Sequence, residues 1–105
     1  MPSPLGEKIR ALREEKGLSL DKLAKLTDSS KGYLWELENR DNPNPSIEKI
    51  DRIARELGVT VEFLVSETAS TPDQEVADRA FFRRYQDLSP DAKAKLAKFL
   101  DVWEE

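Results

Sequence analysis

The sequence predicts an all-α protein in which a domain of five helices is followed by a shorter helical hairpin. Three observations predict this class. Apolar residues recur at intervals of three and four over most of the 105 residues. Serine or threonine precedes most of these stretches, as is typical of helix N-termini. Gly17 and Gly58 each follow such a stretch, as is typical of helix ends. We expect no strands.

The first three expected helices are short and closely spaced. The first covers about residues 4–16 and has an apolar side made of Leu5, Ile9 and Leu12. Ser19 is the expected N-cap of the second, whose inward residues are Leu20, Leu23, Ala24 and Leu26. Asp28, Ser29 and Ser30 make a tight polar turn, and Ser30 caps a third helix that ends near Asn39. Two short helices joined by a tight turn indicate a helix-turn-helix.

Two more helices complete the expected domain. A loop with two prolines and two asparagines leads to Ser46, the expected N-cap of a fourth helix that ends at Gly58. Its expected apolar stripe consists of Ile47, Ile50, Ile53, Ala54 and Leu57. Thr60 is the expected cap of a short fifth helix, which Phe63 and Leu64 anchor.

A small, polar segment divides the chain. We therefore predict a domain over residues 1–66, a linker over 67–71 and a helical hairpin over 72–105. Thr71 is the expected N-cap of the sixth helix, with Pro72 in its first position, and Ser89 and Pro90 begin the seventh. A hairpin of this size cannot bury both of its apolar stripes by itself. The expected dimer or partner residues are Phe81, Tyr85, Leu88, Leu96, Phe99, Leu100 and Trp103.

The composition excludes several classes of function. The chain has no cysteine and no histidine, so disulfides, thiolate zinc sites and Cys–His or Ser–His catalysis are impossible. We expect no enzyme activity, no metal and no cofactor. No apolar run is long enough to span a membrane, and a cytoplasmic location is expected. The net charge is −4, and residues 1–66 hold 11 basic and 12 acidic residues. A role in binding nucleic acid must therefore rest on local arrangement.

From Leu18 to Val65 the sequence resembles the lambda-repressor/Cro, or xenobiotic-response-element, family of helix-turn-helix proteins. The residues that carry the resemblance are Leu23-Ala24, Leu34, Leu37-Glu38-Asn39, Pro45-Ser46, Ala54 and Leu57-Gly58-Val59. The order of this domain and a short helical tail also resembles that of SinR-type bacterial repressors. The resemblance implies a DNA-binding domain that acts as a dimer on a palindromic operator. It further implies an ion pair between Arg13 and Glu38, and it places Asp28 where the family usually has glycine.

The resemblance also implies which residues meet the DNA. With Leu34 and Leu37 inward, the third helix presents its other side to the major groove. The expected DNA-binding residues are Lys31, Gly32, Trp35, Glu36, Asn39, Arg40, Asn42 and Asn44. Two assignments have alternatives. For Trp35 the alternative is packing against a neighbouring helix or a dimer partner, and for Glu36 it is a solvated helix charge.

The sequence thus favours a non-enzymatic, sequence-specific transcriptional regulator, a dimeric repressor whose tail forms the dimer. The alternative is an antitoxin or a protein-controlled repressor whose tail binds a toxin, an antirepressor or a protease. Both interpretations share the DNA-binding domain and differ in the occupant of the tail. An unrelated enzyme is disfavoured, because no nucleophile–base cluster or carboxylate pair stands out.

Overall fold

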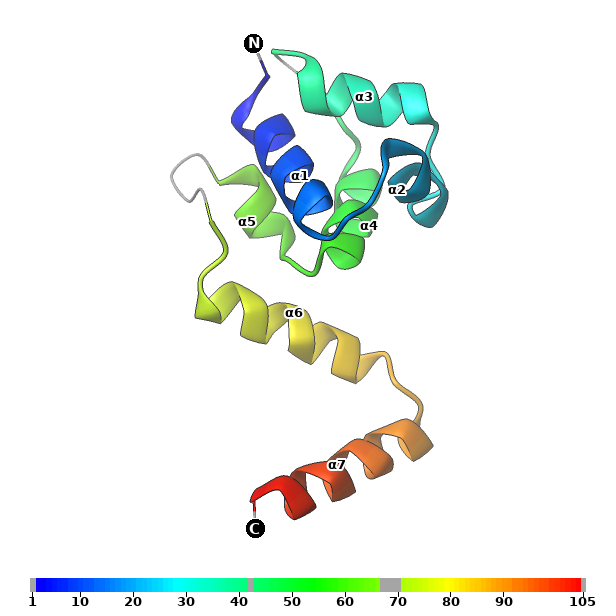
Figure 1. The fold of residues 1–105 in the computed structure, drawn as a ribbon, viewed down its shortest axis with the longest axis vertical. Helices are drawn as coiled ribbons and strands as arrows, with labels where there is room; N and C mark the ends of the chain where they lie inside the picture. The colour runs from blue at the N-terminus through cyan, green and yellow to red at the C-terminus, as the bar shows by residue number, and fades with distance from the viewer. Residues whose placement is uncertain (1, 42, 67–70, 105) are drawn as a thin grey trace.

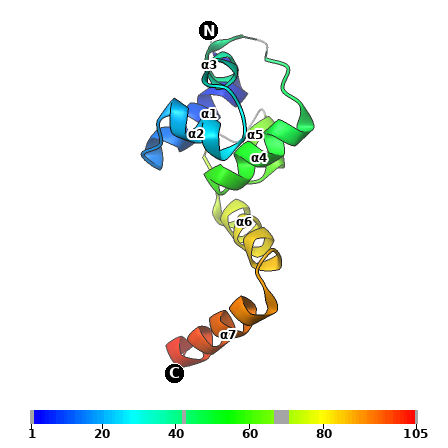
Figure 2. The ribbon, with the colours of Figure 1, turned by 90° about the vertical axis from the view of Figure 1, so that its right-hand side faces the viewer.

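The computed structural model describes residues 2–41, 43–66 and 71–104 and contains seven helices in those ranges. They are α1 (Pro4–Glu15), α2 (Leu20–Leu26), α3 (Lys31–Asn39), α4 (Ile47–Leu57), α5 (Val61–Val65), α6 (Gln74–Gln86) and α7 (Pro90–Glu104). Figure 1 shows α1–α5 gathered into a bundle, with α6 beneath it and α7 diverging at the far end. Figure 2, turned by 90°, shows the same elongated arrangement. We call α1–α5 the bundle, and α6 and α7 the tail.

Side-chain caps begin most helices where the sequence predicts them. The hydroxyls of Ser19, Ser30, Ser46 and Thr60 each accept a backbone N–H from the first turn of α2, α3, α4 and α5. Ser89 caps α7 in the same way, through Ala92 N. The prediction for α6 is wrong: its N-cap is Asp73, whose carboxylate accepts the N–H of Val76 at 3.0 Å. An aspartate is as good a cap as threonine, and this choice leaves Pro72 before the helix.

The core lies between the helices of the bundle, and α6 adds Val76 and Ala80 at its edge. Its buried members come from all five helices and from Val59; they are Ile9, Leu12, Leu23, Ala24, Leu34, Leu37, Ile50, Ile53, Ala54, Leu57, Val59, Phe63 and Leu64. Four predicted inward residues are not among them, of which Leu5 and Leu20 are half-buried and pack against this core. Ile47 is 84% exposed, and Leu26 is 42% exposed. Ile47 is the first residue of α4, one turn before Ile50, where the bundle no longer covers the helix.

A buried ion pair fastens α1 to the end of α3. Glu38 is only 2% exposed, and its carboxylate oxygens accept from Arg13 Nε at 2.7 Å and from Arg13 Nη2 at 3.1 Å. Arg13 Nη1 donates to the carbonyl of Leu18 at 2.8 Å, so the guanidinium also holds the segment before α2. The hydrogen bonds to Glu38 raise the pKa of Arg13 above its usual value. The pair predicted from the family resemblance is therefore present.

The backbones of α1 and α3 also touch directly at Gly6. A Cβ built on Gly6 would lie 2.5 Å from the carbonyl oxygen of Leu37 and 2.7 Å from that of Glu38. Any side chain here would push α1 away from the last turn of α3. Gly6 is thus required by close helix packing and not by an unusual backbone angle.

Lys8 closes the bundle at its opposite edge. Its side chain lies 4.8 Å from the centre of the Phe63 ring, and its Nζ donates to the carbonyls of Phe63, at 2.8 Å, and of Ser66. A cation at the C-terminus of a helix satisfies carbonyls that have no partner within the helix. Burial lowers the pKa of Lys8 below its usual value. The residue therefore fixes the point where the chain leaves the bundle.

The first tail helix is docked on the bundle. Ala80 is buried and Val76 packs against the core. Arg83 Nη2 donates to the carbonyl of Val59 at 3.0 Å, and Arg55 Nη1 lies 2.7 Å from Asp87 Oδ2. The hydrogen bonds to Asp87 and then to Asp51 raise the pKa of Arg55. Helix α6 is thereby oriented relative to the bundle by both apolar and polar contacts.

The second tail helix has no buried residue in its described part. Phe99, Leu100 and Trp103 of α7 are all exposed, as is Phe81 of α6. The predicted hairpin is present as two helices joined by a short turn, but it opens as a V (Figure 1). No helix in the described ranges is long and apolar enough to cross a membrane.

Breaking the Arg13–Glu38 pair should destabilise the protein strongly. We expect Arg13→Met to reduce the free energy of unfolding by roughly 3–5 kcal/mol, because it leaves a buried carboxylate without its partner. Chemical denaturation of the full chain measures this loss. The double variant Arg13→Met/Glu38→Leu should recover a large part of it, since no buried charge remains. Equal losses in the single and double variants would contradict this account.

Candidate nucleic-acid interface

The candidate interface consists of α2, the turn after it and the exposed side of α3. Leu34 and Leu37 anchor α3 in the core, so the opposite side of this nine-residue helix faces outward. Lys31, Gly32 and Glu36 are exposed there, and Trp35 is 51% exposed. The structure therefore brings four predicted site residues to one accessible helix face.

The turn between α2 and α3 has a left-handed residue at its centre. Asp28 has φ of +54°, a conformation that non-glycine residues seldom adopt. Thr27, which is fully buried, donates its hydroxyl to the carbonyl of Leu23 at 2.8 Å, and Ser29 N donates to Ala24 O at 2.8 Å. Aspartate tolerates this conformation better than most residues. This explains how the chain keeps the tight turn without a glycine.

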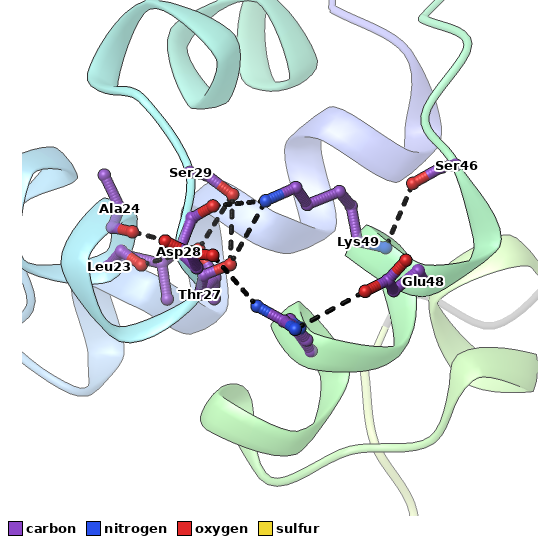
Figure 3. Close-up of polar contacts among 9 residues, drawn as sticks. Leu23, Ala24, Thr27, Asp28, Ser29, Ser46, Glu48 and Lys49 are labelled. Carbon is purple, nitrogen blue, oxygen red and sulfur yellow. Dashed lines mark hydrogen bonds and ion pairs between the residues drawn. The ribbon is translucent and has the colours of Figure 1, made fainter.

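Helix α4 clamps this turn from the side. Lys49 Nζ donates to the carbonyls of Thr27 and Asp28, and Arg52 Nη1 lies 3.5 Å from Asp28 Oδ2. Figure 3 shows Lys49 reaching from α4 across to Thr27 and Asp28, while Ser46 caps the start of the same helix. Lys49 thereby occupies carbonyls at the end of α2, where no further turn of the helix supplies N–H donors; the carbonyl of Thr27 also accepts from Ser29 Oγ at 3.3 Å. The orientation of α3 is therefore fixed by α4 as well as by the core. Sequence reasoning missed Lys49, because its partner carbonyls are more than 20 residues away.

Two of the predicted basic residues already have acidic partners. Lys31 Nζ lies 3.5 Å from Asp21 Oδ2 on α2, and Arg40 Nη2 lies 3.3 Å from Glu36 Oε1. All four side chains are more than half exposed, so these pairs contribute little to stability. They do offset the positive charge that α3 presents to a polyanion.

The remaining predicted residues lie beyond the middle of α3. Asn39 is half-buried, and its Nδ2 donates to the carbonyl of Trp35 at 2.8 Å. Arg40 is the C-cap of α3 and is exposed, as is Asn44. Asn42 lies outside the described residues. An open groove beside α3 collects Glu36, Arg40 and Asn44 together with three residues not predicted for the site; its full lining is Tyr33, Glu36, Leu37, Arg40, Pro43 and Asn44.

The tail carries a separate apolar surface. Of its predicted residues, Tyr85 and Leu96 are half-buried and the others are exposed; those are Phe81, Leu88, Phe99, Leu100 and Trp103. The inside of the V is an open apolar cleft lined by Phe81, Phe82, Tyr85, Leu96, Ala97 and Leu100. Phe82 and Val102, also exposed, extend this surface and were missing from the predicted set. We call the exposed apolar residues of α6 and α7 the tail face.

The chain is similar to known proteins, both over α1–α5 and over nearly its whole length. A helix-turn-helix family model matches residues 9–64. The HTH-type transcriptional regulator SinR of Bacillus subtilis (strain 168) is 31% identical over 99 residues, which cover 92% of this chain and 89% of that protein.

Two solved structures are also similar. A SinR–SinI protein complex superposes with a TM-score of 0.59 at 27% identity, covering 95% of this chain and 97% of the matched chain. A structure of SinR, a master regulator for biofilm formation, in complex with DNA has a TM-score of 0.56 at 35% identity; it covers 59% of this chain and 98% of the matched chain.

Removing the clamp on the turn should loosen α3. We expect Lys49→Met to lower the free energy of unfolding by about 1–2 kcal/mol, because it removes charged hydrogen bonds to two carbonyls. Amide hydrogen exchange at Ser29 should also become faster. The control is Lys25→Met, an exposed lysine in the last turn of α2 whose side chain makes no hydrogen bond or ion pair with the described residues. Equal effects of the two substitutions would rule out the clamp.

Proposed function

We propose a function for this chain from one premise: it belongs to the helix-turn-helix family, of lambda-repressor/Cro type, whose model covers residues 9–64. It is a sequence-specific DNA-binding transcriptional regulator. The observation that carries this function is the exposed side of α3, held rigidly by Leu34 and Leu37 beneath it and by Lys49 at the turn. Its function is binding, without catalysis, and it works where the DNA lies, in the cytoplasm.

The proposed contacts follow from the chemistry of the exposed face. Lys31 donates to guanine acceptors, Glu36 accepts from a cytosine amino group, and the Trp35 ring covers a thymine methyl. All three side chains project from the accessible side of α3. Similarity to a relative that has been solved with DNA supports this placement.

Phosphate contacts come from the edges of the same surface. Arg40 and Asn44 share the groove beside α3, and Asn39 lies at the end of the helix. Asn42, in the same loop, is included in the proposal from the sequence. To contact the DNA, Lys31 must leave Asp21 and Arg40 must leave Glu36. Each exchange replaces one ion pair by another, so each cation adds less affinity than an unpaired one.

We further propose that the protein acts as a dimeric repressor on a palindromic operator. The tail face exposes several aromatic rings, and an exposed apolar surface of this kind marks a site of interaction with another protein. Pairing two tails would place them in a four-helix arrangement. Two recognition helices would then meet successive major grooves about 34 Å apart. Residues 1–66, 67–71 and 72–105 would serve as DNA-binding domain, linker and dimer hairpin, although residues 67–70 lie outside the described part.

One observation favours a second occupant of the tail. A similar relative has been solved in complex with another protein, SinI, and that chain matches almost the whole of this one. A protein partner that covers the tail face would compete with dimer formation and so release the operator. This is the alternative of a protein-controlled repressor or an antitoxin.

The function is tested by selecting bound duplexes from random DNA. We expect a palindromic sequence to emerge and to bind more tightly than a scrambled duplex of the same composition. Because residues 1–66 carry 11 basic and 12 acidic residues, affinity should fall less steeply with salt than for a basic repressor. If the selected and scrambled duplexes bind equally at moderate salt, the protein is not a sequence-specific regulator.

Substitutions of Lys31 and Glu36 should act differently. Glu36→Ala should relax preference at one base pair by roughly 1–3 kcal/mol. It should also strengthen binding to scrambled duplex, because it frees Arg40. Lys31→Ala should weaken binding to both duplexes. Titration of fluorescent duplexes measures each effect. Glu75→Ala is the matched control, since it removes the acid of an equivalent exposed pair with Arg79 on α6. Unchanged base preference in Glu36→Ala would reduce Glu36 to a solvated charge.

Removing α7 should abolish the dimer but not the fold. A chain truncated after Leu88 keeps the contacts of α6 with the bundle and loses half of the tail face. We expect it to be monomeric by sedimentation and to bind the operator much more weakly. Phe99→Asp should behave in the same way, whereas Ala94→Asp, on the other side of α7, should not. If the truncated chain remains dimeric, α7 does not form the dimer and is available to bind a different partner.

A further inference from the structure

Three of the four glycines have a reason inside the molecule. Gly17 and Gly58 have φ values of +70° and +71°, where a side chain is strained. Gly6 lies against the carbonyls of Leu37 and Glu38, where a Cβ has no room. Each of these residues is therefore required by the fold itself.

Gly32 has no such reason. It lies in the first turn of α3 with no positive φ, and a Cβ built on it meets no atom within 4 Å. Glycine within a helix is less favourable than alanine, because it loses more backbone freedom on folding. The fold would therefore gain stability from a side chain at this position. Nothing in the described part of the chain explains the missing side chain.

Gly32 lies among the predicted DNA-contact residues of α3. Residues three and four positions apart share one side of a helix, so Gly32 lies beside Trp35 and Glu36. All three are exposed, and the predicted contact Lys31 precedes them. Gly32 therefore leaves the backbone of α3 without a side chain on the face that is proposed to enter the major groove.

We propose that Gly32 is a specificity-determining residue: its lack of a side chain lets the backbone of α3 reach the base edges and seats the Trp35 ring against them. The inference rests on the proposed function, because it takes duplex DNA as the ligand. Under this proposal, part of the sequence preference comes from the close fit of α3 to the bases, in addition to the hydrogen bonds of Lys31 and Glu36. A methyl group at position 32 holds α3 away from the bases in the specific complex only.

The test compares stability and DNA binding in the same full-length variants. Gly32→Ala should raise the midpoint of thermal unfolding by roughly 2–8 °C. It should weaken binding to the selected duplex by about tenfold, the effect of one disturbed base-pair contact. Binding to the scrambled duplex should not change. Gly32→Leu, which is also compatible with a helix, should weaken specific binding further.

The control variant is Gly17→Ala, whose expected effects on stability and specific binding differ from those of Gly32→Ala. Gly17→Ala should lower the unfolding midpoint, because φ is positive there, and should leave specific binding of the folded protein unchanged. If Gly32→Ala binds the selected duplex as tightly as the unsubstituted protein, the inference is overturned and the proposed function stands. If the unsubstituted protein itself does not distinguish the selected from the scrambled duplex, the proposed function fails instead.

Discussion

The structure depends first on the burial of the Glu38 carboxylate at the junction of α1 and α3. A charge that is 2% exposed is tolerable only with a dedicated partner, and Arg13 supplies two hydrogen bonds to it. The same guanidinium holds Leu18 O, just before α2. One cation of α1 thus sets the position of α1 relative to the two helices of the helix-turn-helix, α2 and α3. The Gly6 contact with the last carbonyls of α3 requires the same close approach.

Several other polar contacts follow a common pattern, in which a cation from one helix donates to carbonyls at or just after the end of another. Lys49 does this for α2, Lys8 does it for α5, and Arg83 reaches Val59 after α4. Such contacts occupy backbone groups that a small core leaves without partners. They also orient whole helices, which is what a binding surface built on one helix face requires. The acidic overall charge conceals this local use of lysine and arginine.

Local patterns predicted the helices and most of their caps, because a cap such as Ser30 is determined by residues within one turn, whereas at α6 two neighbouring candidates, Thr71 and Asp73, compete. The Arg13–Glu38 pair was predicted from the family resemblance alone. Residues whose role depends on distant backbone could not be predicted: Gly6, Lys8 and Lys49 have ordinary neighbours in sequence. Ile47 has the right spacing for the core, but it lies where the bundle ends. The helical spacing correctly predicted which side of α3 is exposed. It did not predict that Lys31 and Arg40 are paired with Asp21 and Glu36.

Those two pairs have a consequence for the search across a chromosome. A regulator meets millions of incorrect sites for each correct one, and its loss to them scales with its general attraction to phosphate. If α3 meets DNA as proposed, Asp21 and Glu36 offset two of the cations on that surface, and we expect non-cognate DNA to hold the protein less tightly than it would without these acids. Fewer copies would then be sequestered along the genome, and a smaller cellular pool would occupy the proposed operator.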